Sequence, residues 1–304
     1  MLDFQHLTLE QIHGVRADFS RPVPRTCDYT VGGLLLWRDY FALSYAAVGS
    51  SMIYRLRLPD GTVAHQVPAD PDPSLLHAIA GTCSAQELPC RFAFVSSEGL
   101  EQLQRIFSAD RLIVTPQREW FDYLYEKDAM ITYAGKKLRG QRNHVNKFCA
   151  AYPRWSFLRA DASHLPLLRE FYGRFQRENQ KSAPTWLEEE RKIPEWLDHF
   201  EEYGFLCGIL TVDGSVAGFS VGERSGDTLV IHTEKADRRF HGSYPMLAAR
   251  FVEAFAGDDP TLRYVNREDD SGDEGLRTAK MSYHPCALLE KYLVELLPER
   301  RLIV

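Results

Sequence analysis

Residues 230–251 read VIHTEKADRRFHGSYPMLAARF and pass from a pattern typical of a buried strand to one typical of an amphipathic helix. The junction is rich in polar chemistry, which comes from His232, Glu234, Lys235, Arg238, Arg239 and the loop residue Gly242. Ligands favour crevices at strand ends, and free backbone N–H groups at a helix start bind anions. This stretch therefore predicts a functional site where the strand meets the helix.

A regular series of elements surrounds this junction. Alternating and helical apolar periods predict helices over 165–179, 194–203, 243–256 and 274–283, and strands over 155–159, 205–212, 215–224, 228–236 and 262–268. Asp213-Gly214 is a strong hairpin signal between two of these strands. Residues 288–297 fit either a strand or a helix. The order helix, helix, hairpin, strand, glycine-bearing loop, helix, strand, helix, strand is that of the GNAT acyltransferase fold.

The first half of the chain shows a looser version of the same order. Helices are predicted over 8–18, over 73–82, from residue 98 and in the basic segment 135–153, and strands within 33–46, 52–58, 62–68, 90–95 and 111–116. Alternating helices and strands indicate a mixed α/β domain. We therefore expect an α+β protein of two tandem GNAT-like domains, residues 1–153 and 154–304, each a mixed sheet flanked by helices.

Composition agrees with a folded protein of this size. The 304 residues are 44% apolar and 26% charged, and are enough for two domains of about 150 residues. The N-terminus lacks the apolar run of a secretory signal, and the longest apolar region, 31–48, is interrupted by Arg38 and Asp39. The six cysteines show no metal-binding spacing. These features predict a cytoplasmic protein without a transmembrane segment.

Three longer blocks resemble a known family. They are GKKLRGQRNHVNKF (135–148), IHTEKADRRFHGSY (231–244) and YVNREDDSGDEGLRTAKMSYHP (264–285), and they are similar to the signature blocks of the phosphatidylglycerol lysyltransferase C-terminal domain family. The resemblance implies a duplicated GNAT-like fold related to Fem-type aminoacyl transferases, which move an amino acid from aminoacyl-tRNA to an amine or hydroxyl acceptor. The expected acceptor is a small molecule or a lipid head group. Lipid-modifying members carry a membrane-spanning region before this domain, and this sequence shows none, which argues against a lipid acceptor.

Two residues of the junction strand are candidates for proton transfer. Strand alternation predicts Val230, His232 and Glu234 on one face and Ile231, Thr233 and Lys235 on the other. Amine attack on an ester or thioester needs a base, and a carboxylate or an imidazole provides one. Tyr283 is a candidate acid for the leaving group. The competing interpretation of His232 and Glu234 is a pair of satisfied polar residues at the wet end of a strand.

The loop after the strand is the candidate donor site. Arg239, Gly242 and Ser243 partly fit the GNAT pyrophosphate motif, but Tyr244 occupies its final small position and would crowd a coenzyme A pyrophosphate. Asn266 and Arg267, at the end of the next strand, complete the predicted donor site. The sequence therefore favours aminoacyl-tRNA over a coenzyme A thioester and defines no certain cofactor.

The acid-rich segment 266–274 does not predict a metal site. Its spacing differs from that of an EF-hand loop, which places ligands at alternate positions before a bidentate Glu. Ser271 or Asp273 as the cap of a following helix explains the acids more simply.

A basic segment stands out in a chain of net charge −6. Residues 129–160 contain seven Lys or Arg and no Asp or Glu. We interpret Lys136, Lys137, Arg139, Arg142, Asn143 and Asn146 as an anion-binding face, for tRNA, a nucleotide or a lipid head group. The alternative is a solvated helix face.

Three functions remain for comparison with the structure. The first is an aminoacyl transferase that uses aminoacyl-tRNA, and the second is a coenzyme A dependent N-acetyltransferase. The third is a non-catalytic GNAT-like module that binds an anionic ligand. The side chains of His232 and Glu234 separate the third from the others, because a catalytic pair must face an open cleft.

Overall fold

The computed structural model describes residues 2–70 and 72–298, and the chain forms two compact units. Of the described residues, the first unit contains 2–70, 72–121 and 289–298, and the second contains 122–288. The predicted boundary between residues 153 and 154 therefore differs from the observed division. The pairing of two strands, β7 (Asp122–Glu126) and β14 (Tyr292–Leu296), accounts for the difference.

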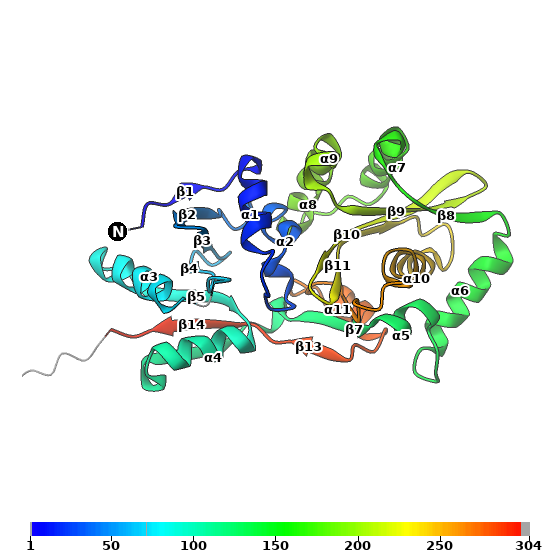
Figure 1. The fold of residues 1–304 in the computed structure, drawn as a ribbon. Coiled ribbons are helices and arrows are strands. Elements are labelled where there is room, and N and C mark those ends of the chain that lie inside the picture. The colour runs from blue at the N-terminus through cyan, green and yellow to red at the C-terminus, as the bar shows by residue number, and fades with distance from the viewer. Residues whose placement is uncertain (1, 71, 299–304) are drawn as a thin grey trace, which may run out of the picture. The chain divides into compact units, whose positions relative to one another are not determined.

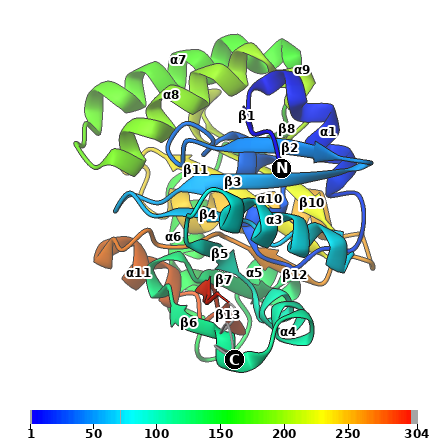
Figure 2. The same ribbon diagram turned by 90° about the vertical axis from the view of Figure 1, so that its left-hand side faces the viewer.

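The first unit is built on a seven-stranded sheet (Figure 2). Its strand order is β1 (Gln5–His6), β2 (Ser44–Val48), β3 (Ser51–Arg57), β4 (Val63–His65), β5 (Cys90–Val95), β14 (Tyr292–Leu296) and β6 (Leu112–Pro116). Neighbours pair antiparallel, except that β4 and β5 are parallel. The undecided segment 288–297 thus supplies a strand, and β14 returns the end of the chain to the first sheet by pairing with both β5 and β6.

The described part of this unit contains the α-helices α1 (Ile12–Asp18), α2 (Val31–Leu35), α3 (Pro73–Ala85) and α4 (Ser97–Ile106). Apolar residues of α3, α4, β5 and β14 form one core cluster. The predicted strand over 33–46 is wrong except at its end, since α2 occupies 33–35, turns follow it, and β2 begins only at Ser44. Thr30 explains the helix, because its hydroxyl accepts a hydrogen bond from the Gly33 amide at 2.9 Å and caps the helix start.

The second unit contains the other seven-stranded sheet. Its strand order is β13 (Ala287–Leu289), β7 (Asp122–Glu126), β12 (Tyr264–Asn266), β11 (Thr228–Ala236), β10 (Ser215–Ser225), β9 (Leu206–Val212) and β8 (Trp155–Arg159). β11 and β12 are parallel, whereas β12 pairs antiparallel with β7. Because β7 joins this sheet, the second unit begins at Asp122.

Helices cover both faces of the second sheet (Figure 1). On one face lie α7 (Leu165–Glu178), α8 (Pro184–Asp198) and the short α9 (Phe200–Tyr203). The long α10 (Ser243–Ala256) packs on the other face beside α5 (Lys127–Thr132) and α6 (Arg139–Ala151), and α11 (Glu274–Met281) follows β12. The predicted order from two helices through hairpin, strand, loop, helix, strand and helix to a final strand is confirmed.

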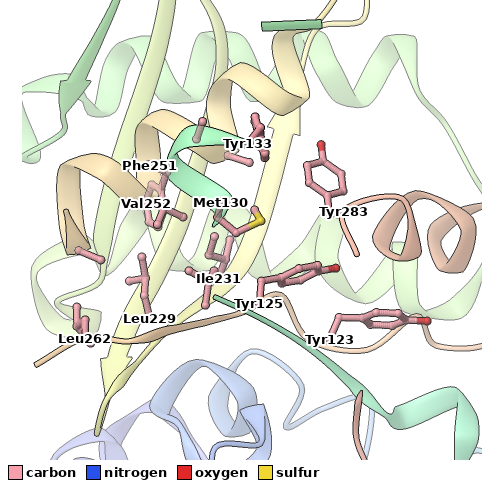
Figure 3. Close-up of a cluster of buried hydrophobic side chains, with 14 of the residues drawn as sticks. Tyr123, Tyr125, Met130, Tyr133, Leu229, Ile231, Phe251, Val252, Leu262 and Tyr283 are labelled. Carbon is pink, nitrogen blue, oxygen red and sulfur yellow. The ribbon is translucent and has the colours of Figure 1, made fainter. Parts of the chain in front are cut away.

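The main core of this unit lies between α10 and the sheet. It joins Leu229 and Ile231 of β11 to Phe251 and Val252 of α10, and Figure 3 shows these side chains together with several tyrosines. Tyr123, Tyr125, Tyr133 and Tyr283 belong to the same buried cluster. These four tyrosines bring hydroxyl groups into an otherwise apolar core, close to the ends of β11 and β12 where the sequence predicts a functional site.

Candidate active site where two parallel strands diverge

Strands β11 and β12 separate in the middle of the second sheet. Their pairing runs from Thr228 with Tyr264 to Val230 with Asn266, although β11 continues to Ala236. A parallel pair that ends while one strand continues leaves room for side chains between the diverging segments. His232 and Glu234 lie on the part of β11 that has separated from β12 but still pairs with β10. Arg267 and Glu268 directly follow β12.

A β-bulge at His232 changes which face each β11 side chain occupies. Opposite β10, Thr233 pairs with Val221 and Ile231 pairs with Gly222, so His232 is the extra residue. Ile231 packs with α10, whereas the Lys235 ammonium contacts Glu189 of α8 at 2.6 Å. Regular alternation would have placed Ile231 and Lys235 on one face. The predicted facing of these side chains is therefore wrong, because the bulge reverses the alternation beyond His232.

His232 is held between two carboxylates. Its Nδ1 lies 2.7 Å from Glu268 Oε1 and its Nε2 lies 2.8 Å from Glu223 Oε1, while the side chain is only 1% exposed. Burial lowers the pKa of His232, but the hydrogen bonds to Glu223 and Glu268 outweigh it and raise the pKa from 6.5 to about 9. At neutral pH both nitrogens donate, so this imidazolium has no lone pair for the general-base role predicted from the sequence.

Glu234 and Arg267 form a second buried ion pair across the divergence. Arg267 Nε and Nη2 both donate to Glu234 Oε2, at 2.8 and 2.5 Å. Glu234 Oε1 and Arg267 Nη1 are buried and have no hydrogen-bond partner among the described residues. One acceptor and one donor are thus left for a bound molecule, since buried polar atoms without partners are rare.

A third buried polar atom lies on the neighbouring strand. Ser220 pairs directly with Glu234 across β10 and β11, and its hydroxyl also has no partner among the described residues. Directly paired residues project to the same face of a sheet. Ser220 therefore adds a hydroxyl beside the Glu234 carboxylate.

Tyrosine rings enclose the guanidinium of Arg267. The guanidinium carbon lies 4.4 Å from the ring centre of Tyr283 and 5.9 Å from that of Tyr125. Figure 3 shows these two rings near each other, above Tyr123. Burial raises the pKa of Tyr283 to about 12, although Arg267 opposes the shift, so the phenol keeps its proton at neutral pH. The structure thus brings together three predicted residues, Glu234, Arg267 and Tyr283.

The acids after β12 are engaged in the fold. Asp270 accepts hydrogen bonds from Tyr123 at 2.6 Å and from Arg277 at 2.9 and 3.0 Å, and Asp273 caps α11 by accepting from the Leu276 amide. Asn266 donates to Asp122 at 2.8 Å and accepts from the Glu268 amide at 2.7 Å. Asn266 is fully buried, so these contacts account for its amide without a donor substrate.

The β11–α10 loop carries the predicted donor residues, and most of its polar groups are occupied. Arg239 holds Asp237 with Nε at 3.0 Å and Nη2 at 2.6 Å, and the Ser243 hydroxyl donates to the Asp237 carbonyl oxygen at 2.9 Å. Tyr244 is half-buried, and burial raises the pKa of its phenol. The loop lines a cleft of about 160 Å³ together with α7, whose lining residues are Phe171, Arg174, Phe175, Glu178, Asn179, Asp237, Arg238 and Arg239.

Gly242 has a structural reason to be glycine. Its φ is +87°, and a Cβ atom at this position would lie 2.5 Å from the carbonyl oxygen of His144 in α6. The close approach of α6 accounts for this glycine without a pyrophosphate. This observation weakens the comparison with the coenzyme A motif.

The predicted anion-binding residues lie on and before α6. Lys136, Lys137, Arg139, Asn143 and Asn146 are exposed, and in the described ranges no ion pair or side-chain hydrogen bond engages Lys136, Lys137 or Arg139. Arg142 differs, because its Nη1 donates to the carbonyl oxygens of Tyr133 and Gly135, at 2.5 and 3.1 Å. Arg142 therefore supports the end of α5, and the other basic side chains form the free surface.

Comparison with known proteins adds an identification to this geometry. The family model described as phosphatidylglycerol lysyltransferase, C-terminal, matches residues 21–295. The chain belongs to this family. The resemblance recognised in the sequence blocks is thereby confirmed, and the fold is the duplicated GNAT-like α+β fold that the family implies.

Solved structures resemble this member of the phosphatidylglycerol lysyltransferase C-terminal family over nearly its whole length. A conserved protein of unknown function from Bacteroides thetaiotaomicron VPI-5482 is 27% identical, with a TM-score of 0.86 over 97% of this chain and 100% of that one. The C-terminal domain of a putative lysylphosphatidylglycerol synthetase from Agrobacterium fabrum is 13% identical, with a TM-score of 0.63 over 94% and 91%. The second likeness shows a shared fold.

A curated relative matches part of the chain. An uncharacterized protein of Mycoplasmoides gallisepticum is 25% identical over 179 residues, which are 58% of this chain and 56% of that protein. This chain thus spans little more than half of that relative. Within residues 2–70 and 72–298, no helix has the length and apolar character needed to cross a bilayer.

Several site residues escaped the sequence analysis. Glu223 lies near the end of the hairpin strand β10, Tyr125 comes from β7, and Tyr133 directly follows α5. The aromatic residues within 121–125 are the local sequence signal for the tyrosine rings around the Arg267 guanidinium. Glu268 is different, because the sequence already makes it a plausible pocket residue beside Asn266 and Arg267. Only its contact with His232 was missed, and that contact depends on the bulge in β11.

Proposed function

We propose that this chain transfers an aminoacyl group from aminoacyl-tRNA to an amine or hydroxyl acceptor. The observation that carries the proposal is the half-satisfied ion pair of Glu234 and Arg267, which offers one free acceptor and one free donor where β11 and β12 diverge. Membership of the phosphatidylglycerol lysyltransferase C-terminal family supports the acyl-transfer chemistry. The exposed basic residues of α6 support a polyanionic donor.

The proposed reaction needs three actions from these side chains. Arg267 Nη1 donates a hydrogen bond to the ester carbonyl oxygen and stabilises the negative charge that develops there. Glu234 Oε1 accepts the proton of the attacking amine or hydroxyl. A bond forms between the acceptor and the carbonyl carbon, the ester C–O bond breaks, and the ribose oxygen of the tRNA takes up a proton, for which Tyr283 is the proposed donor.

His232 has a different role in this proposal from the one expected of it. Its imidazolium is a positioning group, because it binds Glu268, the residue next to Arg267. The acceptor is a small molecule or a lipid head group. Aminoacyl-tRNA as the donor implies a reaction in the cytoplasm, where tRNA is charged.

The non-catalytic alternative also has a supporting observation. The His232 side chain is 1% exposed and that of Glu234 is 12% exposed, so neither lies on a wide cleft. A silent anion-binding module would keep the ion pairs as structural contacts. A transfer experiment separates this alternative from the proposal.

The test uses total tRNA charged with radiolabelled amino acids and the small-molecule and lipid fractions of a cell extract as acceptors. The wild-type protein is expected to move label from tRNA into one fraction, and Glu234→Gln to lower the rate roughly 10²-fold to 10⁴-fold. Glu170→Gln is the matched control, because Glu170 is exposed on α7. Absence of transfer by the wild type, or transfer only from acetyl-coenzyme A, would refute the proposal.

A further inference from the structure

Lys280 is a buried charge within the third sequence block, 264–285, and neither the sequence analysis nor the proposed reaction gives it a role. The residue lies in the last turn of α11 and is only 9% exposed. Burial lowers the pKa of its ammonium, which Asp269 and Glu268 partly oppose. Its ammonium forms no salt bridge with a carboxylate among the described residues. A buried ammonium is costly, so its hydrogen-bond partners indicate what it does.

The partners of Lys280 are two carbonyl oxygens of one turn. Lys280 Nζ donates to the Arg267 carbonyl oxygen at 2.6 Å and also to that of Asp269. The ring of Tyr123 lies 5.7 Å from the ammonium. The two carbonyls stand on either side of Glu268, so a single ammonium binds the backbone before and after this residue.

Glu268 needs such support because its backbone is strained. Its φ is +55°, in the left-handed region that residues other than glycine rarely adopt. The Asn266 side chain also accepts a hydrogen bond from the Glu268 amide at 2.7 Å. The strained conformation therefore depends on groups from outside the turn.

The turn decides where two functional side chains point. Arg267 reaches Glu234, and Glu268 reaches the bulge residue His232, at 2.5 and 2.7 Å respectively. If the turn relaxed, the Glu268 carboxylate would leave His232 and the Arg267 guanidinium would leave Glu234. Both ion pairs across the diverging strands thus depend on one backbone conformation.

We infer that Lys280 is a positioning residue, whose ammonium fixes the 267–269 turn so that Arg267 and Glu268 hold their partners on β11. Its effect on the ion pairs is independent of which reaction the site performs. Its effect on turnover rests on the proposed aminoacyl transfer. These two consequences are measured separately, so that failure of one is distinguished from failure of the other.

The first measurement is the pKa of His232. NMR of protein with labelled imidazole rings tracks the titration, and the His232→Gln variant identifies the signal of His232. The charged and titratable groups that face this imidazole are Glu223 of β10 and Glu268 of the turn. Lys280→Met is expected to lower the pKa of His232 by at least one unit from about 9, because Glu268 withdraws. Lys181→Met, at an exposed position before α8, is the control and is expected to leave the pKa of His232 unchanged.

A merely structural lysine would give a different result. Loss of thermal stability in Lys280→Met with an unchanged His232 titration would overturn the inference. If Lys280→Met does not fold, Lys280→Gln provides the same comparison, because its shorter, neutral amide donates to only one of the two carbonyls and leaves the other without its donor. An unchanged titration in this folded variant would equally overturn the inference.

The second measurement is aminoacyl transfer by the same variants. Lys280→Met is expected to lower kcat at least tenfold while KM for aminoacyl-tRNA changes less than threefold, because the variant misplaces Arg267 without touching the basic surface. Lys280→Arg, which keeps the charge and the donors, should restore part of kcat. If Lys280→Met shifts the pKa of His232 but keeps the kcat of the wild type, Lys280 positions the ion pairs without affecting turnover, which contradicts its role in the reaction. If Lys280→Met shifts the pKa of His232 but even the wild type transfers no aminoacyl group, the proposed function is refuted and the positioning role of Lys280 stands.

Discussion

His232 Nδ1 lies 2.7 Å from Glu268 Oε1, although the two residues are 36 positions apart in the chain. The contact crosses the gap between β11 and β12, and the bulge at His232 turns the imidazole toward it. Together with Glu223, it makes His232 a buried cation with two acidic partners. Stability, pH dependence and site geometry are therefore linked through one side chain.

The first prediction concerns the pH dependence of folding. The folded-state pKa of His232, about 9, is above the ordinary value of 6.5, so its stabilisation is complete below pH 6.5 and is lost as pH rises through 9. A shift of this size corresponds to about 3 kcal/mol. Urea unfolding at pH 6, 7.5 and 9 should show this loss in the wild type and a flatter profile in His232→Gln. The exposed His199→Gln variant should follow the wild type, and an equally steep profile in His232→Gln would contradict the prediction.

The second prediction concerns Gly242. Gly242→Ala should lower the free energy of unfolding by at least about 2 kcal/mol, because it combines a left-handed φ with a Cβ that meets the His144 carbonyl oxygen. Gly140→Ala is the control, since nothing lies within 4 Å of its added Cβ, and it should stabilise α6 by about 0.5 kcal/mol. Denaturant unfolding measures both. Unchanged stability of Gly242→Ala, with loss of coenzyme A binding, would instead assign this glycine to a ligand.

The third prediction concerns the basic surface of α6. If tRNA binds there, log affinity falls linearly with log salt by roughly 0.7 to 0.9 per phosphate contact. Lys137→Ala combined with Arg139→Ala should flatten this slope by roughly one to two units, because both side chains are exposed. Arg154→Ala is the control, as Arg154 belongs to the same acid-free segment but is paired with Asp213. Equal slopes for the double variant and the wild type would show that these side chains form a solvated helix face and do not contact the tRNA phosphates.

The fourth prediction separates Arg142 from that surface. Arg142→Ala removes the hydrogen bonds to the carbonyl oxygens of Tyr133 and Gly135, and should cost roughly 1 to 3 kcal/mol of stability. The salt dependence of tRNA binding should stay as in the wild type. Lys136→Ala, at an exposed position, should leave stability unchanged. A flattened slope in Arg142→Ala without any loss of stability would return this residue to the anion-binding group.

Local pattern was enough to predict most of the second unit. The Asp213-Gly214 turn, the strand over 228–236 and the helix over 243–256 each follow from short-range periodicity and turn chemistry, and the structure places them at β9–β10, β11 and α10. The family was also readable from the sequence, because its three blocks are continuous in the chain. Glu234, Arg267 and Tyr283 were candidates for that reason.

Only the tertiary structure decided the unit boundaries and the partners of the site residues. β14 inserts between β5 and β6, and β7 pairs with β12, over separations along the chain that periodicity does not encode. The bulge at His232 depends on the register with β10, and a shift of one residue reverses every later side chain. The sequence by itself thus determined the family, the order of elements and the residue types of the site. Register and long-range pairing determined which of those residues meet, because each depends on contacts between distant segments.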